Sequence, residues 1–234
     1  MEIDYSNIKV IGFDADDTLW VNETYFREAE EDVGRLLSHY ETPNKIDQEL
    51  FKMEMKNLST YGYGVKGFVL SMVELAIDVS NGQVSNSIVS KILNIGKDMI
   101  NKPIELLDGV EKVLITLSKH YRLIIATKGD LLDQERKLEK SGLLQYFHHI
   151  EVLSEKQEAN YEKLLLHLDI IPAEFLMIGN SLKSDILPVV NIGASAIHIP
   201  FHTTWQHENV SKEQTHGKSY KTIDHLIEIL DVLQ

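Results

Sequence analysis

Residues 9–19 read KVIGFDADDTL, and this stretch decides the fold. Its first half is a continuous apolar run, which is typical of a strand buried on both faces of a parallel sheet. The run gives way to Asp14, Asp16, Asp17 and Thr18. In open α/β sheets, ligands bind beyond the carboxyl ends of the strands. We therefore expect a functional site where this strand ends.

Four further short, mostly apolar runs indicate more strands of the same kind. With the first, they lie at 9–16, 122–127, 150–154, 174–180 and 193–200. Helical patterns separate the last four, with apolar residues three and four positions apart, as in Tyr161, Leu164, Leu165 and Leu168. Alternating strands and helices predict a doubly wound, Rossmann-like parallel α/β sheet.

The connection between the first and second strands breaks this rhythm, because it contains no convincing strand. It carries four amphipathic helical patterns instead, at 26–40, 46–58, 65–76 and 84–99. Helices with apolar faces of their own can form a small bundle. We expect an α/β core made of residues 1–19 and 101–234, and an inserted helical cap domain at 20–100. Hinges are expected at Leu19–Asn22 and Lys102–Asp108.

The composition excludes several classes of protein. The 234 residues are 43% hydrophobic and 25% charged, which is ordinary globular composition, and there is no cysteine for disulfides or thiolate chemistry. The formal net charge of −13 disfavours nucleic acid and anionic membrane surfaces as partners. No apolar run approaches the roughly 20 residues of a membrane span, and residues 1–7, MEIDYSN, do not resemble a secretory signal. We expect a cytoplasmic protein; the sequence indicates nothing about protein partners.

Polar residues follow four of the predicted strands, so the topology gathers them at one edge of the sheet. They are Asp14, Asp16, Thr127, Lys128, Lys156, Asn180 and Asp185. Clustered carboxylates require a nearby cation to stay ionised, and ligand sets made only of oxygen favour Mg²⁺. The hydroxyl, the ammonium groups and the backbone N–H groups near Lys128 can bind an anion. These residues predict a site for magnesium and a phosphate group.

In this arrangement the sequence resembles the haloacid dehalogenase superfamily, whose members are mostly phosphatases with an aspartate nucleophile. The first motif of that family, hhhDxDxT, is matched by IGFDADDTL at 11–19. The second, a Thr or Ser after a strand, is matched at Thr127, and the third, a lysine, at Lys156. The fourth, an acidic motif after an apolar strand, is matched by MIGNSLKSD at 177–185.

The resemblance implies roles for these residues. Asp14 would attack phosphorus to form an aspartyl-phosphate, and Asp16 would act as general acid and then as general base. Thr127 and Lys156 would stabilise the transferring phosphoryl group, and Lys128, beside Thr127, is a further candidate for binding the phosphate. Magnesium would be held by Asp14, the backbone carbonyl of Asp16 and Asp185, with Asn180 close by. Asn180 departs from the family, which often has Asp there, so the site carries one charge fewer.

Other functions on the same residues stay open. A phosphomutase or a 2-haloacid dehalogenase could use this site, although an acid at Asp16 is unneeded for a halide leaving group. A non-enzymatic phospho-receiver also uses Asp, Thr and Lys at strand ends, but it is about half as long and carries its acceptor on a later strand. For the phosphatase, the inserted helices predict a lid and therefore a small phosphorylated metabolite as substrate.

Each motif residue also has a simpler structural interpretation. Asp17 and Thr18 could cap a turn, GNSLKSD could be a turn that caps a helix, and Lys163 is a rival for the role of Lys156. The segment 61–64, YGYG, could be a turn or a substrate loop. The His-containing loop at 198–216 has no readable role, and its histidines lack the carboxylates that would suggest a zinc site.

Overall fold

The computed structural model describes residues 5–233 and divides the chain into two compact units. The α/β unit runs up to Glu23 and continues through Ile104–Lys128 and from Glu135 onward. The helical unit comprises Thr24–Pro103 together with the short segment Gly129–Gln134. The chain passes into the helical unit after Glu23 and returns after Pro103, and it passes into that unit again for Gly129–Gln134.

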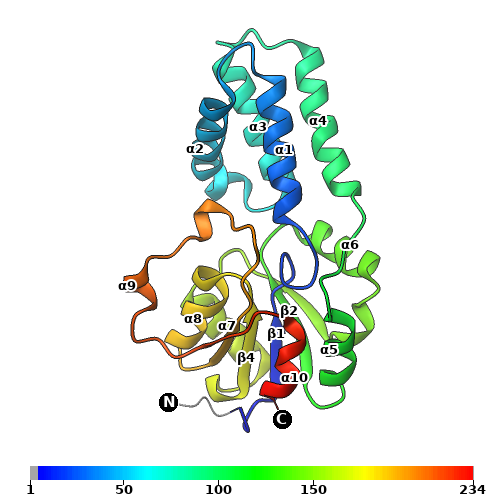
Figure 1. Ribbon diagram of the computed structural model, residues 1–234, viewed down its shortest axis with the longest axis vertical. Helices are drawn as coiled ribbons and strands as arrows, with labels where there is room; N and C mark the ends of the chain where they lie inside the picture. The colour runs from blue at the N-terminus through cyan, green and yellow to red at the C-terminus, as the bar shows by residue number, and fades with distance from the viewer. Residues whose placement is uncertain (1–4, 234) are drawn as a thin grey trace. The chain divides into compact units, whose positions relative to one another are not determined.

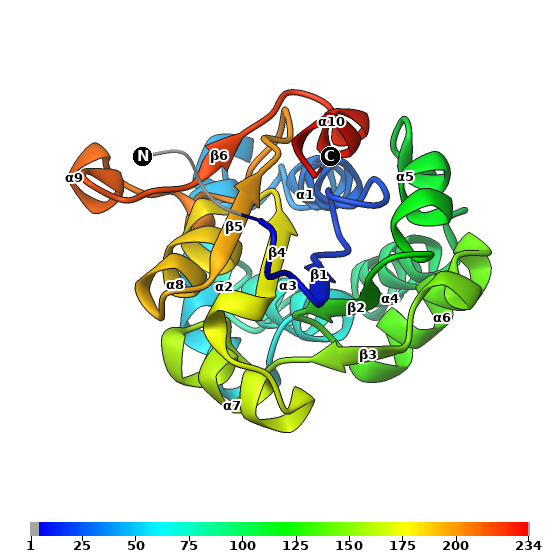
Figure 2. The ribbon, with the colours of Figure 1, turned by 90° about the horizontal axis from the view of Figure 1, so that it is seen from below.

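The α/β unit is built on six parallel strands in the order β3-β2-β1-β4-β5-β6 (Figure 2). The strand that precedes the aspartates, β1, lies in the middle between β2 and β4, so all of its residues are buried. This arrangement confirms the doubly wound parallel sheet. The strands are β1 (Val10–Phe13), β2 (Arg122–Thr127), β3 (His149–Val152), β4 (Phe175–Gly179), β5 (Ser195–His198) and β6 (Lys221–Thr222).

Helices cover both faces of the sheet, and each face has a separate apolar core. On one face, side chains of α5 (Val110–Leu117), α6 (Leu131–Ser141) and α10 (Ile229–Val232) pack on β1 and β2. On the other face, α7 (Glu158–Leu168) and α8 (Leu187–Asn191) pack on alternate residues of the same strands. Strands buried on both faces must be apolar throughout, which explains why the sequence shows continuous rather than alternating runs.

The helical unit contains the four helices expected from the amphipathic patterns, joined by short turns (Figure 1). Their apolar faces form one core that includes Val33, Leu50, Met72 and Ile92. Gly62 and Gly64, with φ of 73° and 98°, make the turn that the sequence YGYG left open. The helices are α1 (Glu23–Leu36), α2 (Pro43–Tyr61), α3 (Val65–Val79) and α4 (Asn86–Asn101).

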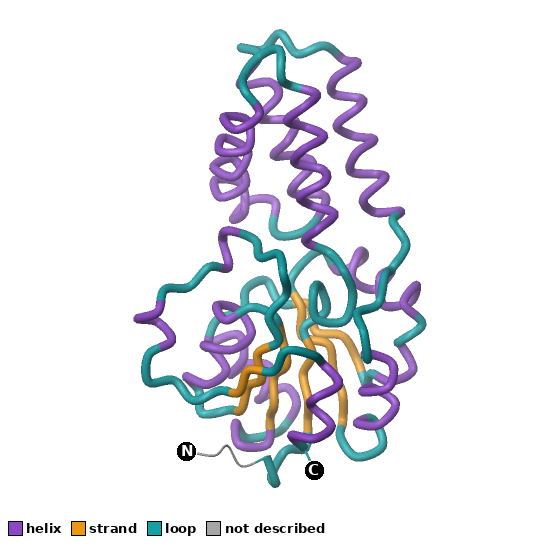
Figure 3. The backbone as a smooth tube through the Cα atoms, in the orientation of Figure 1, coloured by secondary structure: helices purple, strands orange, loops and turns teal. Residues whose placement is uncertain are grey.

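The sequence did not predict β6, and the physical reason is plain. This strand consists of two exposed residues at the edge of the sheet, so it has no apolar run to reveal it. The remaining short elements lie in loops (Figure 3): η1 (Leu144–Tyr146), η2 (Pro172–Glu174), η3 (Leu182–Ile186), η4 (Gln206–Glu208), α9 (Lys212–Thr215) and η5 (Leu226–Glu228). Within residues 5–233, no helix is both long and apolar enough to cross a membrane.

Candidate active site

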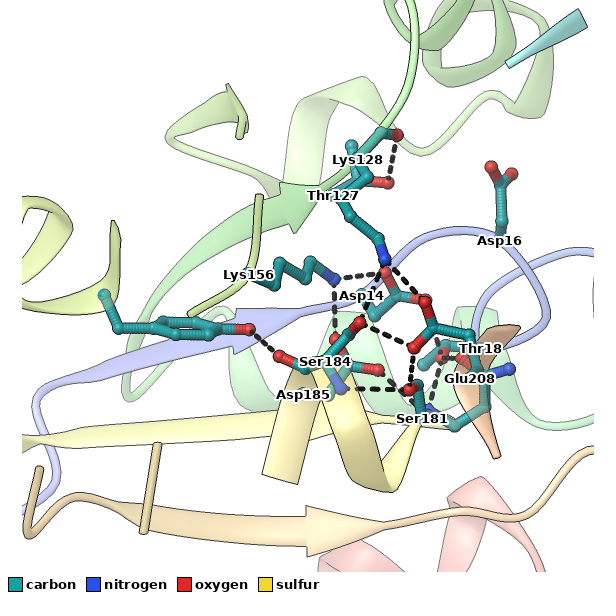
Figure 4. Close-up of polar contacts among 12 residues, drawn as sticks. Asp14, Asp16, Thr18, Thr127, Lys128, Lys156, Ser181, Ser184, Asp185 and Glu208 are labelled. Carbon is teal, nitrogen blue, oxygen red and sulfur yellow. Dashed lines mark hydrogen bonds and ion pairs between the residues drawn. The ribbon is translucent and has the colours of Figure 1, made fainter. Parts of the chain in front are cut away.

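The carboxyl ends of β1, β2 and β4 bring polar residues together inside the α/β unit. Asp14 follows β1, Thr127 ends β2, Lys156 lies four residues beyond β3, and Asn180 follows β4. Figure 4 shows these strand ends and the polar network formed there. Because the strands are parallel and adjacent, residues separated by more than a hundred positions in sequence meet at one edge.

Lys156 joins the two buried carboxylates at the centre of the site. Its ammonium donates to Asp14 Oδ1 at 2.5 Å and to Asp185 Oδ1 at 2.6 Å, and its side chain is 1% exposed. Burial alone would lower the pKa of Lys156, but the charges of Asp14 and Asp185 raise it well above the ordinary value. The lysine is therefore a fixed cation. Its rival, Lys163, is exposed on α7.

Asp14 has a raised pKa despite its contact with the Lys156 ammonium. Burial raises the pKa of Asp14 to about 7, against the lowering effect of Lys156, and the neighbouring Asp185 raises it further. One ammonium thus faces two buried carboxylates. A further cation bound nearby would favour the ionised form of Asp14.

The turn after β4 holds Asp185 in place. Asp185 Oδ2 accepts a hydrogen bond from the backbone N–H of Ser181 at 3.0 Å, and the Ser181 hydroxyl caps the following turn by accepting from Ser184 N–H at 3.0 Å. A Cβ atom on Gly179 would lie only 2.3 Å from Asp185 Oδ2. A glycine at this strand end is required for the Asp185 carboxylate to fold back against it.

Asp17 and Thr18, which could both have been simple capping residues, have different roles. Asp17 adopts a left-handed conformation with φ of 62°, and its carboxylate accepts hydrogen bonds from the backbone N–H groups of Asn22 and Glu23, at the start of α1. Thr18 belongs to the site, because its hydroxyl donates to Asp14 Oδ2 at 3.1 Å and accepts from Asn180 N–H at 3.1 Å. Thr18 links the loops after β1 and β4.

Asp16 stands apart from the Asp14 network, as Figure 4 shows. Its Oδ1 accepts hydrogen bonds from Trp20 Nε1 at 2.7 Å and from Lys137 Nζ at 2.8 Å. The carboxylate is about a quarter exposed. Asp16 therefore lies at a partly open rim of the site and is held by two donors that sequence reasoning did not identify.

The two candidate phosphate ligands at the end of β2 have other partners in the structure. Thr127 is buried and its hydroxyl donates to the carbonyl oxygen of Lys128 at 3.1 Å. The Lys128 ammonium donates to Glu208 Oε1 at 2.6 Å and to Ser184 Oγ at 2.9 Å. The Lys128 ammonium thereby connects the end of β2 to two neighbouring loops.

Glu208 gives the His-containing loop a structural role. Its Oε2 accepts hydrogen bonds from the hydroxyls of Ser181 and Ser184, the latter at 2.6 Å (Figure 4). Burial would raise the pKa of Glu208, but Lys128 and the two hydroxyls lower it to about 2. This loop is thereby anchored to the ends of β2 and β4. We name Lys128, Ser181, Ser184 and Glu208 the Glu208 network.

The histidines near the site also bind neighbouring loops. His198 Nε2 donates to the carbonyl oxygen of Asn180 at 3.1 Å, and burial lowers the pKa of His198. The carbonyl oxygen of His207 accepts from Lys183 Nζ at 2.7 Å. These contacts hold Asn180 and the loop at 198–216 in position.

The residues proposed as metal ligands fit a magnesium ion by their chemistry. Asp14, Asp185 and Asn180 can each offer a side-chain oxygen, and burial, with the neighbouring Asp185, raises the pKa of Asp14. Within residues 5–233, no group of three or more His, Cys, Asp or Glu side chains is arranged to hold a metal ion. The Asp16 carboxylate faces Trp20 and Lys137, so a contribution from this residue would come from its backbone carbonyl.

Sequence reasoning missed Lys137, Trp20, Ser184 and Glu208. Lys137 is one of several polar residues on α6, and Glu208 lies in a loop with no regular pattern. The sequence around each position does not indicate its role, because that role depends on contacts with segments far away in the sequence. Ser184 lies inside the fourth motif, directly before Asp185. Its hydroxyl, the second in that motif after Ser181, could have indicated a role in the site.

Comparison with known proteins identifies the family. The chain belongs to the haloacid dehalogenase-like hydrolases, whose family model matches residues 8–193. It is similar to a haloacid dehalogenase-like family hydrolase from Xanthomonas campestris, with 39% identity and a TM-score of 0.80, over 88% of this chain and 87% of that one. The fold and the order of the motifs thus define a hydrolase of this family.

The curated relatives are phosphatases. N-acylneuraminate-9-phosphatase from Homo sapiens is 25% identical over 87% of this chain and 84% of its own length. Glyceraldehyde 3-phosphate phosphatase from Methanothermobacter thermautotrophicus is 30% identical over 50% of this chain and 53% of its own length. The chain is therefore a phosphatase-like hydrolase.

Proposed function

We propose that this protein is a magnesium-dependent phosphatase that hydrolyses a small phosphorylated metabolite through an aspartyl-phosphate on Asp14. The observation that carries this proposal is the Lys156 ammonium, which binds both Asp14 and Asp185 at the end of the central strand. A buried lysine between two carboxylates fixes the nucleophile and places positive charge where a phosphoryl group would arrive.

The reaction would proceed in two steps. An oxygen of Asp14 attacks phosphorus, the bond from phosphorus to the ester oxygen breaks, and protonated Asp16 gives its proton to the leaving alkoxide. Ionised Asp16 then takes a proton from water, whose oxygen attacks phosphorus and releases inorganic phosphate and free Asp14. In both steps, Lys156 offsets negative charge beside Asp14.

Magnesium would be held by Asp14, Asp185, the backbone carbonyl of Asp16 and the Asn180 amide. When bound, it would supply positive charge to the phosphoryl oxygens and offset the repulsion between Asp14 and Asp185. Because Asn180 brings no charge, we expect weaker magnesium binding than an aspartate at this position would give.

The proposed substrate class is a phosphate ester of a sugar or a similar small polyol. Two relatives, named for N-acylneuraminate-9-phosphate and glyceraldehyde 3-phosphate, support this class. The inserted helical unit, residues 20–100 in the sequence-based division, would act as a lid that selects the leaving group. Most of this unit, Thr24–Pro103, is inserted between the first and second motifs.

A substrate panel tests the proposal. The wild-type protein is incubated with p-nitrophenyl phosphate, sugar phosphates, phosphopeptides and 2-chloropropionate, each with magnesium and with EDTA. We expect magnesium-dependent release of phosphate, with the highest kcat/KM for a small sugar phosphate. Chloride release would indicate a dehalogenase instead, phosphate transfer between positions of a sugar would indicate a phosphomutase, and a stable phosphoprotein without turnover would indicate a receiver.

A further inference from the structure

We infer that Lys137, on α6, is a positioning residue for Asp16, and this inference rests on the proposed phosphatase function. Lys137 Nζ donates to Asp16 Oδ1 at 2.8 Å, across 121 positions of sequence. Nothing in the motif pattern points to this lysine. It is brought to the site because α6 packs beside the loop that follows β1.

The same ammonium also holds the loop that carries Asp16. Lys137 Nζ donates to Asn22 Oδ1 at 2.8 Å, so it bridges two residues six positions apart in that loop. Asp17 closes the same loop from within, because its N–H donates to the carbonyl oxygen of Trp20 at 2.7 Å and its carboxylate accepts from Asn22 N–H at 2.8 Å. Lys137 thus fixes both the side chain and the backbone path of the proposed acid–base residue.

Trp20 provides the second hydrogen bond that holds the Asp16 carboxylate. Its indole is 1% exposed and its Nε1–H donates to Asp16 Oδ1 at 2.7 Å. A buried indole is a rigid donor, whereas the long lysine side chain comes from another element of the fold. Two donors on one carboxylate oxygen leave the carboxylate little freedom to rotate. A proton donor must be held in the correct orientation, since a misplacement of about 1 Å can cost roughly 100-fold in rate.

The contacts of Lys137 differ from those of Lys156. The Lys137 side chain is 16% exposed and its ammonium donates to Asp16 and Asn22, while the Lys156 ammonium donates to Asp14. The two lysines therefore have separate partners. Lys156 binds the proposed nucleophile, and Lys137 binds the proposed acid–base residue.

The test compares leaving groups in Lys137→Met. Proton donation matters for an alkyl ester and much less for p-nitrophenyl phosphate, whose leaving group is already a weak base. In single-turnover kinetics, we expect the rate of the first chemical step to fall about tenfold or more for the best alkyl phosphate of the panel and only about twofold for p-nitrophenyl phosphate. Lys137→Arg, which keeps a donor and a charge, should restore most of the alkyl ester activity.

The matched control is Lys140→Met, on the same helix but exposed. It should leave the rate of the first chemical step at the wild-type level for both esters. Equal losses for the two leaving groups in Lys137→Met, or the same behaviour in Lys140→Met, would overturn the inference. Circular dichroism confirms that each variant is folded.

A second measurement does not depend on activity. The protein has two tryptophans, Trp20 and Trp205, so an amide correlation spectrum shows two indole N–H signals, which Trp205→Phe assigns. We expect Lys137→Met and Asp16→Asn to shift the Trp20 signal, and Lys140→Met to leave it in place. If the wild-type protein hydrolyses no ester while the Trp20 signal shifts, the proposed function fails and the positioning by Lys137 stands. An unchanged Trp20 signal in Lys137→Met would contradict the positioning itself.

Discussion

Two lysines at neighbouring strand ends, Lys156 and Lys128, show how similar contacts produce different kinds of site. Lys156 binds two carboxylates, Asp14 and Asp185, and is almost fully buried. Lys128 binds one carboxylate, Glu208, and one hydroxyl, Ser184, with its side chain 15% exposed. The first cluster keeps an excess negative charge, and the second is balanced within itself.

This difference in charge balance suggests a catalytic role for the Lys156 cluster and a structural role for the Lys128 cluster. A cluster with two carboxylates and one ammonium attracts a further cation, and the pKa of Asp14 in it is raised to about 7 by burial first and by Asp185 to a lesser extent. A balanced cluster is stable as it stands, and the pKa of Glu208, lowered to about 2 by Lys128 and the serine hydroxyls against the effect of burial, reflects it. We therefore expect changes in the first cluster to affect turnover and changes in the second to affect stability.

The largest effect should come from Asp14→Asn. An amide is a far poorer nucleophile than a carboxylate, so kcat should fall below about a thousandth of the wild-type value. Steady-state hydrolysis of p-nitrophenyl phosphate by freshly purified protein, checked for deamidation, measures this. Retention of a tenth of wild-type kcat would mean that Asp14 is not the nucleophile.

Asp16→Asn should have the next largest effect, because Asn cannot transfer a proton to the leaving group. We expect a loss of about 10²–10⁴-fold on alkyl phosphates and a smaller loss in the first chemical step for good leaving groups. Single-turnover kinetics across a series of leaving groups measures this step. A uniform loss across the series would argue against Asp16 as the acid.

These two residues also show what can be predicted from sequence. Motif order predicts Asp14, Lys156 and Asp185, and the structure brings them together because the ends of parallel strands must share one edge. The motif also predicts that Thr127 binds a phosphate, which stays a prediction; in the structure its hydroxyl donates to the carbonyl oxygen of Lys128. Glu208 and Lys137 could not be predicted. Glu208 lies in a loop and Lys137 on a helix surface, and neither segment has a sequence pattern that shows which residues it contacts in the fold.

Magnesium binding should respond to charge at the fourth motif. Asp185→Asn should raise the magnesium concentration needed for half-maximal activity by more than about tenfold, because it removes one of the two carboxylates proposed to hold the metal. Asn180→Asp should lower that concentration or leave it unchanged. Calorimetric titration with magnesium provides a check without substrate. Full activity in excess EDTA would rule out the metal requirement.

The smallest effect on turnover, and the largest on stability, should come from Glu208→Gln. This change leaves the Lys128 ammonium without its anionic partner, and we expect the free energy of unfolding at pH 7 to fall by about 3 kcal/mol. Urea unfolding measures it, and Glu213→Gln, at an exposed site in the same loop, is the control. Unchanged stability in Glu208→Gln would contradict a supporting role for the Glu208 network.

The pH dependence of this contribution has a definite sign. The pKa of Glu208 is about 2 in the folded protein and near 4.5 in the unfolded chain. Its contribution is therefore complete above about pH 4.5 and is lost as the pH falls toward 2. The difference in unfolding free energy between the wild-type protein and Glu208→Gln should shrink over this range. A difference that stays constant from pH 7 to pH 3 would mean that the carboxylate charge is not the source.

The most direct test of the central claim is to trap the phosphorylated residue. The wild-type protein is mixed with magnesium and the best substrate of the panel, quenched in acid during turnover, reduced with borohydride and digested for peptide mass spectrometry. Borohydride converts an acyl phosphate of aspartate to homoserine, so we expect homoserine at position 14, and no homoserine at that position in Asp14→Asn. Rapid turnover with unmodified Asp14, or homoserine at another aspartate, would contradict the proposed mechanism.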